Sequence, residues 1–329
     1  MTPRRPPRLR RLALVVLAVL VLGGGSLGYV LHARHRGMPT ATVDGSFSLA
    51  EPGLYYRDSA TGQVARRSGT GGPPATGGPA CERFYAAGER ALCLRKLPGI
   101  PARTQALVLD RGLREIKRVT VPGIPNRARV SASGNVLSWT TFATGDSYAT
   151  TAFSTRTSIL DLRTGYLIKS MEEIPLTIDG SRYHSGDVNY WGVTFARDDN
   201  RFYATVSTRG RTHLVEGDLR NWSAKALREN VECPSLSPDG TRIAFKKKVS
   251  DDPAAPWRLY VLDLADMREH PLAETRSVDD QAAWLDAETV GYALPGREGR
   301  ADDTWTVPAN GTSEPHLLIP GGSSPTAVS

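Results

Sequence analysis

The sequence predicts an all-β protein, a β-propeller of four-stranded blades that follows one N-terminal transmembrane helix. Two observations lead to this prediction. Residues 12–31 form a run of 20 residues without a charged side chain, and a strand–turn–strand pattern occurs five times after residue 80. No helical periodicity accompanies these copies, so the domain is expected to consist of strands.

The uncharged run has the length that an α-helix needs to cross the hydrocarbon core of a membrane. More arginines precede the run than follow it, which favours a cytoplasmic N-terminus and an exported domain. We therefore expect a basic tail at 1–11, a transmembrane helix or signal anchor at 12–31, a linker at 32–44 and an extracytoplasmic propeller at 45–329. A cleaved signal peptide is the alternative, and it would give a secreted protein. The flanking arginines are Arg4, Arg5, Arg8, Arg10 and Arg11 before the run and Arg34 and Arg36 after it.

The net charge of the chain is +7, and these seven arginines equal all of it. The basic pI therefore reflects the membrane flank. It does not indicate a nucleic-acid-binding surface, which would need clustered Lys and Arg on the folded domain. We expect the membrane, through residues 12–31, to be a partner of this chain, and we expect no nucleic acid.

The repeated pattern is clearest at residues 234–245. Apolar and polar residues alternate, Pro238-Asp239-Gly240 turns the chain, and the alternation resumes at Ile243 and Phe245. This arrangement is typical of two short strands joined by a tight turn. A third strand is expected at 259–264 and a fourth near 269–272.

The turns of the five copies lie near residues 88, 134, 199, 240 and 287, and most spacings match the ~40–50 residues of a propeller blade. Such blades bury their faces by packing radially against one another. Segments 46–49, 54–57 and 63–66 are expected to supply three strands of a further blade, and the tail 325–329 its missing innermost strand. The prediction is therefore six blades, with residues 67–80 as a flexible Gly/Pro-rich stretch.

The segment Leu236-Ser-Pro-Asp-Gly-Thr-Arg-Ile-Ala-Phe245 resembles the repeat of TolB-like propellers, which are WD40-like and related to the propellers of prolyl-oligopeptidase-type enzymes. In the other four copies Pro-Asp-Gly becomes Ala-Ala-Gly, Ala-Ser-Gly, Arg-Asp-Asp and Asp-Ala-Glu. The resemblance covers residues 45–320 and implies a fold. It implies no catalytic residue, because the Ser-Pro-Asp-Gly element is a turn in that family. High Arg, Ala, Gly and Pro usage suggests a GC-rich bacterial source.

Of the three cysteines, Cys81 and Cys93 flank the predicted hairpin turn at residue 88. Counting outward from the turn places them nearly opposite each other, so a cross-strand disulfide is feasible in an oxidising compartment. Two buried thiols are the alternative. Cys233 is expected in the core.

No catalytic, metal or cofactor motif is found. The six histidines lie at no metal-binding spacing, and no Gly-x-Ser-x-Gly or glycine-rich nucleotide motif occurs. We therefore predict a protein that is not an enzyme and needs no cofactor. The alternatives are a propeller enzyme acting on cell-wall or extracellular glycan at the central pore and a small-ligand sensor. The carboxylates available to the former are Asp146, Asp187, Asp251 and Asp252.

Three long connections, 140–153, 178–191 and 250–257, are expected to gather on one end of the ring. The second combines aromatic and charged residues, which are usual in recognition sites on rigid scaffolds. The expected partner is an envelope or membrane-associated protein. The predicted binding residues are Arg182, Tyr183, His184, Asp187, Tyr190 and Trp191.

Overall fold

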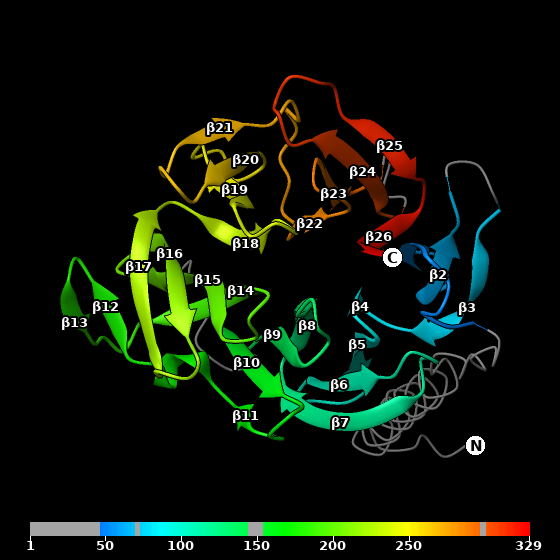
Figure 1. The fold of residues 1–329 in the computed structure, drawn as a ribbon, viewed down its shortest axis with the longest axis horizontal. Coiled ribbons are helices and arrows are strands. Elements are labelled where there is room, and N and C mark those ends of the chain that lie inside the picture. The colour runs from blue at the N-terminus through cyan, green and yellow to red at the C-terminus, as the bar shows by residue number, and fades with distance from the viewer. Residues whose placement is uncertain (1–46, 70–72, 144–153, 297–300) are drawn as a thin grey trace, which may run out of the picture. The chain divides into compact units, whose positions relative to one another are not determined.

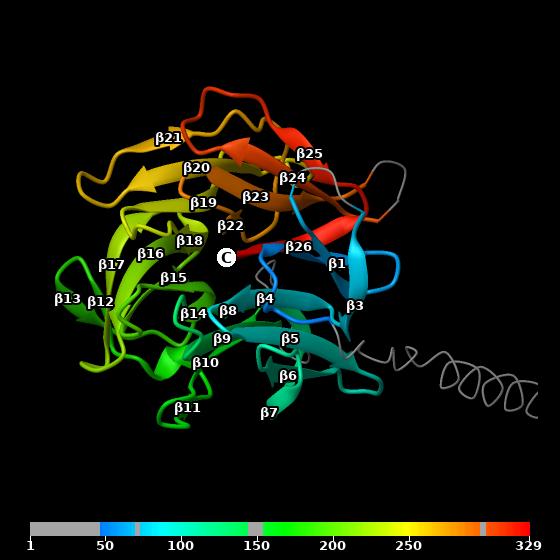
Figure 2. The same cartoon turned by 45° about the vertical axis from the view of Figure 1, so that its right-hand side comes forward.

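The computed structural model describes residues 47–69, 73–143, 154–296 and 301–329. These residues form six sheets placed around a common axis, as Figure 1 and Figure 2 show. The predicted all-β propeller with six four-stranded blades is confirmed. The predicted membrane segment 12–31 lies outside the described residues, and within them no helix is long and apolar enough to span a membrane.

Each blade is an antiparallel sheet whose first strand lies nearest the axis. From the inside outward, the strands are β26 (Gly322–Val328), β1 (Gly53–Asp58), β2 (Gln63–Arg67) and β3 (Ala75–Ala80) in blade 1; β4 (Arg83–Ala87), β5 (Arg90–Leu97), β6 (Arg103–Leu109) and β7 (Glu115–Pro122) in blade 2; β8 (Ile124–Val130), β9 (Val136–Phe142), β10 (Thr155–Asp161) and β11 (Leu167–Ile168) in blade 3; β14 (Asn189–Phe195), β15 (Arg201–Thr208), β16 (Arg211–Asp218) and β17 (Ser223–Glu229) in blade 4; β18 (Glu232–Leu236), β19 (Arg242–Lys248), β20 (Trp257–Asp263) and β21 (Glu269–Pro271) in blade 5; and β22 (Ala283–Trp284), β23 (Thr289–Leu294), β24 (Asp303–Pro308) and β25 (His316–Ile319) in blade 6.

Burial falls from the second strand of a blade to its outermost strand. In blade 3, six of the seven residues of β9 are buried, whereas β7, at the outside of blade 2, has no buried residue. The inner strands are covered on both faces because each blade packs against two neighbours. Between blades 2 and 3, for example, Leu92 and Leu94 join Leu137 and Trp139 in one apolar cluster. Burying one such leucine contributes about 2 kcal/mol.

The predicted hairpin turns near 88, 134, 199, 240 and 287 all join the first and second strands of a blade. Two of them need glycine. Gly88 and Gly134 have φ angles of 58° and 79°, which favour glycine. A Cβ atom on Gly88 would also lie 2.8 Å from the carbonyl carbon of Ser133, because the turns of blades 2 and 3 touch.

The ring closes through the last strand of the chain, as predicted. Strand β26 pairs antiparallel with β1, with Tyr55 opposite Thr326 and Gly53 opposite Val328. The Thr326 hydroxyl also donates a 2.7 Å hydrogen bond to the carbonyl oxygen of Ala86 in blade 2. Blade 1 is thus completed by the C-terminal segment.

Two predictions about blade 1 are wrong. The Gly/Pro-rich stretch 67–80 contains the outermost strand β3, which pairs with β2. Gly and Pro are tolerated there because an outermost strand keeps one edge free of ladder hydrogen bonds. The segment at 46–49 is not a strand where it is described. Phe47 and Leu49 instead bury their side chains, and the Leu49 amide donates to the carbonyl oxygen of Arg111 at 2.8 Å.

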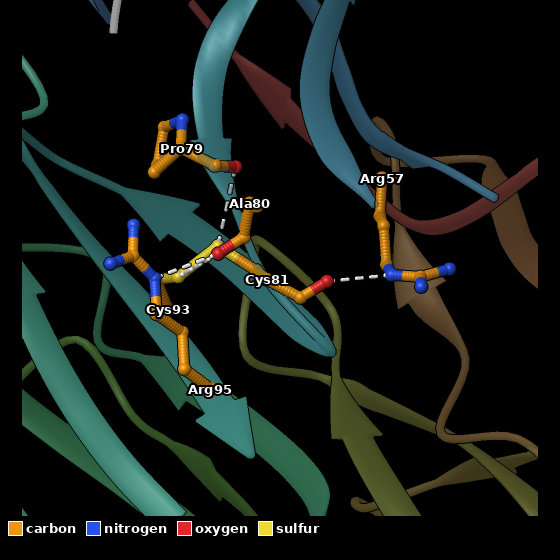
Figure 3. The surroundings of a disulfide bond; sticks show 6 residues. All are labelled: Arg57, Pro79, Ala80, Cys81, Cys93 and Arg95. Carbon is orange, nitrogen blue, oxygen red and sulfur yellow. Dashed lines mark hydrogen bonds between the residues drawn. A yellow bond between two sulfur atoms is a disulfide. The ribbon is translucent and has the colours of Figure 1, made fainter. Parts of the chain in front are cut away.

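Cys81 and Cys93 form a disulfide, and Cys233 is a buried free thiol. The two bonded residues are not directly opposite each other, because Cys93 faces Phe84 across the hairpin. Cys81 lies in the short link before β4, so the bond ties the passage between blades 1 and 2 to β5. Figure 3 shows two arginines beside it: Arg57 Nε donates to the Cys81 carbonyl oxygen at 2.6 Å, and Arg95 Nε to that of Ala80 at 2.8 Å.

We predict that the double substitution Cys81→Ser/Cys93→Ser lowers the free energy of unfolding by about 3 kcal/mol, because the crosslink restricts the unfolded chain. Urea unfolding of the oxidised protein and of the variant measures this difference. Cys233→Ser is the control for the loss of a thiol that is not crosslinked. Equal stability of the oxidised protein and the double variant would contradict the prediction.

Candidate functional site

Blade 4 carries an addition that the other blades lack within the described residues. After the short 3-10 helix η1 (Met171–Glu173), strands β12 (Leu176–Ile178) and β13 (Ser181–Tyr183) form a hairpin. Strand β12 pairs in parallel with β17, the outermost regular strand. The sheet therefore has six strands, and β13 is its outer edge, visible beyond β12 in Figure 1. We call β12 and β13 the blade-4 hairpin.

The structure separates the six predicted binding residues into two groups. Arg182 and Tyr183 lie in β13, and His184 and Asp187 follow it in the link to β14. Tyr190 and Trp191 lie in β14, where their exposed fractions are 0% and 6%. The expectation that all six belong to one loop is therefore wrong for these two aromatic residues, because β14 is an inner strand covered on both sides.

Asp187 holds the link in place. Its carboxylate accepts hydrogen bonds from the hydroxyls of Ser185 at 2.6 Å and Thr208 at 2.7 Å and from the amide of Arg209 at 2.6 Å. These bonds to Ser185, Arg209 and Thr208 lower the pKa of Asp187 to about 2. Thr208 also contacts the Tyr183 hydroxyl at 2.8 Å. Asp187 and Tyr183 therefore fix the hairpin against the turn between β15 and β16.

Two residues of the hairpin region remain free to contact a partner. Arg182 and His184 are exposed, and their side chains make no hydrogen bond or ion pair with the residues that the structure describes. Beside them, between η1 and β13, lies a hollow of about 560 Å³. The walls of this hollow include Glu172, Glu173 and Leu176. The region thus combines an open strand edge, two unpaired basic side chains and a partly apolar hollow.

We predict that Asp187→Asn destabilises the fold above pH ~4 and has little effect near pH 2. The folded-state pKa of about 2 lies below the usual 3.8, so the ionised carboxylate contributes stability above pH 3.8. That contribution is lost as the pH falls toward 2. Urea unfolding of both proteins at several pH values measures the difference, and a constant difference between pH 2 and 6 would contradict the assignment.

A second cluster of ionisable groups lies near the axis, between blades 3, 5 and 6. Lys246 of β19 is 4% exposed. Its ammonium lies 2.5 Å from the Asp279 carboxylate and 3.6 Å from that of Glu232. The Arg127 guanidinium is 3.7 Å from Asp279 and donates to Asn126 Oδ1 at 2.8 Å. We call Lys246, Glu232, Asp279 and Arg127 the axial charge cluster.

The members of this cluster neutralise one another. Burial raises the pKa of Glu232, although Lys246 opposes the shift. Burial would also raise the pKa of Asp279, but the charge and hydrogen bond of Lys246 hold it below its usual value. Burial lowers the pKa of Lys246, but the neighbouring Cys233, Asp279 and Glu232 together outweigh it, so the pKa is raised. The arrangement favours a structural role for these paired charges.

Sequence reasoning missed this cluster. The run of three lysines at 246–248 is expected to be a solvated strand end, and Asp279-Asp280 a solvated pair. The structure corrects the first expectation for Lys246, whereas Lys248 is half exposed and pairs with Asp251 at 2.8 Å. One sequence signal could have found the cluster: Lys246 lies in the second strand of a predicted blade, and such a strand is buried on both faces.

The axial charge cluster borders a hollow of about 400 Å³. Its walls include Arg83, Trp257 and the carboxylates of Asp279, Asp280 and Asp302. The Arg83 side chain makes no hydrogen bond or ion pair in the described part of the chain. Burial and the neighbouring Arg127 lower its pKa.

The acidic residues considered for glycan hydrolysis do not assemble into a site. Asp187 belongs to the blade-4 link, Asp251 pairs with Lys248, and the Asp252 carboxylate accepts the Ala254 amide at 2.9 Å. Asp146 lies outside the described residues. Among the described residues, no group of three or more His, Cys, Asp or Glu side chains could hold a metal ion.

No protein-family model matches the sequence, and no curated protein sequence matches it. Solved structures do match. TolB from Acinetobacter baumannii has a TM-score of 0.58 at 16% identity, covering 84% of this chain and 66% of that chain. A chain of the nidogen/laminin complex has a TM-score of 0.54 at 10% identity, covering 85% and 99%. A puromycin-hydrolysing peptidase of Mycobacterium tuberculosis matches with a TM-score of 0.49 at 15% identity, covering 83% and 44%.

The likeness to TolB, together with the six sheets, defines the class of the fold, a TolB-like six-bladed β-propeller. At such low identities they define nothing beyond the fold. The likeness in fold agrees with the resemblance of residues 236–245 to the repeat of TolB-like propellers.

We predict that Lys246→Met destabilises the protein by about 3–5 kcal/mol, because Glu232 is then buried without a cation. Adding Glu232→Gln should recover part of the loss, since an amide tolerates burial better than a carboxylate. Chemical unfolding measures both effects. Lys248→Met, on the same strand, is the matched control and should stay within about 0.5 kcal/mol. Equal losses at the two lysines would refute the structural role of the cluster.

Proposed function

We propose that this chain is a non-catalytic interaction scaffold. In this proposal the segment 12–31 holds the TolB-like propeller at the membrane, outside the cytoplasm, and the blade-4 hairpin binds an envelope or membrane-associated protein. The observation that carries the proposal is the added hairpin, which exposes the edge of β13 together with the unpaired Arg182 and His184.

The chemistry of the hairpin fits a peptide segment of a protein partner. An open strand edge offers backbone N–H and C=O groups to an extended peptide, and neighbouring side chains select its sequence. Arg182 can pair with a carboxylate of the partner, and the hollow beside β13 can receive an apolar side chain. Asp187 and Tyr183 keep the surface ordered before binding, which reduces the entropy lost on association.

The axial charge cluster supports a role without catalysis. General acid catalysis at neutral pH requires a carboxyl group that stays protonated and reaches a substrate. Asp279 reaches the hollow, with a side chain that is 70% exposed, but Lys246 keeps it ionised. Glu232 has the raised pKa, but its side chain is only 7% exposed. A purified protein that cleaves a glycan and loses this activity on Asp279→Asn would replace the proposal with an enzymatic one.

We predict that a photo-reactive amino acid at position 184 captures one protein of defined mass in membranes that contain the full chain. The capture should be lost on Arg182→Glu, which reverses the charge beside β13. The same amino acid at Arg220, an exposed residue of another blade-4 turn, is the control. Equal capture from both positions, or none from position 184, would contradict the role of the hairpin.

We predict that the protein in membrane fractions retains residues 12–31, because their length suits a membrane span. Intact mass measurement of the extracted protein tests this. A mass that lacks roughly the first 30 residues would show a cleaved signal peptide and would make the propeller a secreted protein.

A further inference from the structure

Blade 2 concentrates positive charge. From Arg83 to Pro122 the chain has nine Arg or Lys residues and three Asp or Glu residues, a net charge of +6. The whole chain carries +7, and its N-terminal arginines already equal that value. The remaining blades are therefore acidic as a group. One blade thus differs electrostatically from the rest of the ring.

Several of these cations are not neutralised within the protein. Arg111, Arg114 and Arg118 form ion pairs with Glu89, Asp110 and Glu115. These three pairs use every carboxylate between residues 83 and 122. In contrast, Lys96, Arg103 and Lys117 form no ion pair with the residues that the structure describes. Lys96 and Arg103 are exposed, and they flank the loop between β5 and β6.

The β5–β6 loop also exposes an apolar side chain. Ile100, at the tip of the β5–β6 loop, is fully exposed at 102%. The loop residues 98–102 carry no charge. An uncharged tip with an isoleucine, bordered by basic residues, has the composition of a surface that enters the headgroup region of a bilayer.

The N-terminal part of the described chain also reaches the propeller at blade 2. The Leu49 amide donates to the Arg111 carbonyl oxygen between β6 and β7, and Phe47 and Leu49 share an apolar cluster with Leu107 and Leu113. Only residues 32–46 separate this point from the predicted membrane segment. Fifteen residues span at most about 50 Å, so a tether of this length would keep the propeller within reach of the bilayer.

We propose that the β5–β6 loop of blade 2 rests on an anionic membrane surface. Ile100 enters the headgroup region, and Lys96 and Arg103, which flank the loop, contact lipid phosphates. The orientation rests on the membrane tether of the proposed function, but the lipid affinity belongs to the propeller itself. In this arrangement the blade-4 hairpin, on another blade, stays available for a protein partner.

The test uses the propeller fragment 42–329, which contains all six blades, the closing strand β26 and the apolar clusters between blades. It is mixed with vesicles of phosphatidylcholine alone or of equimolar phosphatidylcholine and phosphatidylglycerol, and sedimented. We expect binding to the anionic vesicles only, with clear weakening at high salt, since exposed charges are screened. Lys96→Glu/Arg103→Glu should lower the partition coefficient at least tenfold, and Ile100→Ser should lower it severalfold.

Matched control variants distinguish binding by this local surface from a general effect of net charge. Arg156→Glu/Arg220→Glu changes the net charge equally at exposed positions of blades 3 and 4, and Leu317→Ser removes an apolar side chain that is 47% exposed in blade 6. Both should bind like the unchanged fragment. Equal losses in these controls, or no sedimentation with anionic vesicles, would overturn the proposal. Retention on heparin without vesicle binding would assign the surface to a soluble polyanion instead and would also overturn it.

The result is independent of the tether, because the fragment lacks residues 1–41. Failure of vesicle binding would leave the tether and the hairpin proposals standing. A cleaved N-terminus in the mass measurement would remove the tether and leave the lipid affinity standing.

Discussion

The pairing of β26 with β1 is the contact on which the rest of the structure depends. It joins the last strand of the chain to the first, so the six blades become a ring in which every blade has two neighbours. The inner strands are apolar on both faces and need both neighbours to be buried. Thr326 extends the closure into blade 2 through the Ala86 carbonyl oxygen. The ring then supplies a rigid frame, and the distinctive chemistry lies in additions to it.

Those additions have different physical characters. The axial charge cluster is largely buried at Lys246, Glu232 and Arg127, and its opposite charges pair with one another, so it ties blades 3 and 5 to the link between blades 5 and 6. The blade-4 hairpin and the edge of blade 2 are open, and each leaves basic side chains without an internal partner. Enclosed charges stabilise the ring, whereas open charges remain available to molecules outside it. This contrast supports the proposed role of the propeller as an interaction scaffold.

The alternation of apolar and polar residues and the residue types at the turns made the fold predictable. The blade-4 hairpin, the axial charge cluster and the edge of blade 2 depend on which side chains pack together in three dimensions, and the sequence does not show this. Three of the five turns were predictable because Gly88, Gly134 and Gly240 separate short alternating strands. The other two, near residues 199 and 287, follow from polar residues between strands of the same pattern. Strand β3 was missed because Gly and Pro are acceptable at an outer edge. The blade-4 link was identified correctly as unusual, yet Tyr190 and Trp191 were assigned to it because aromatic residues look alike in a loop and in a buried strand. The positive charge of blade 2 was not apparent because the net charge of residues 37–329 is zero.

The disulfide has a consequence for the order of events in biosynthesis. Three thiols allow three pairings, and only one of them is native. Cys81 and Cys93 are separated by 12 residues, whereas Cys233 follows far along the chain. In a chain delivered from its N-terminus, the native pair can be oxidised before the third thiol appears, and a short loop closes faster than a long one. Cys233 is enclosed in blade 5 as the ring closes, so delivery from the N-terminus would favour the native pair over the two other pairings.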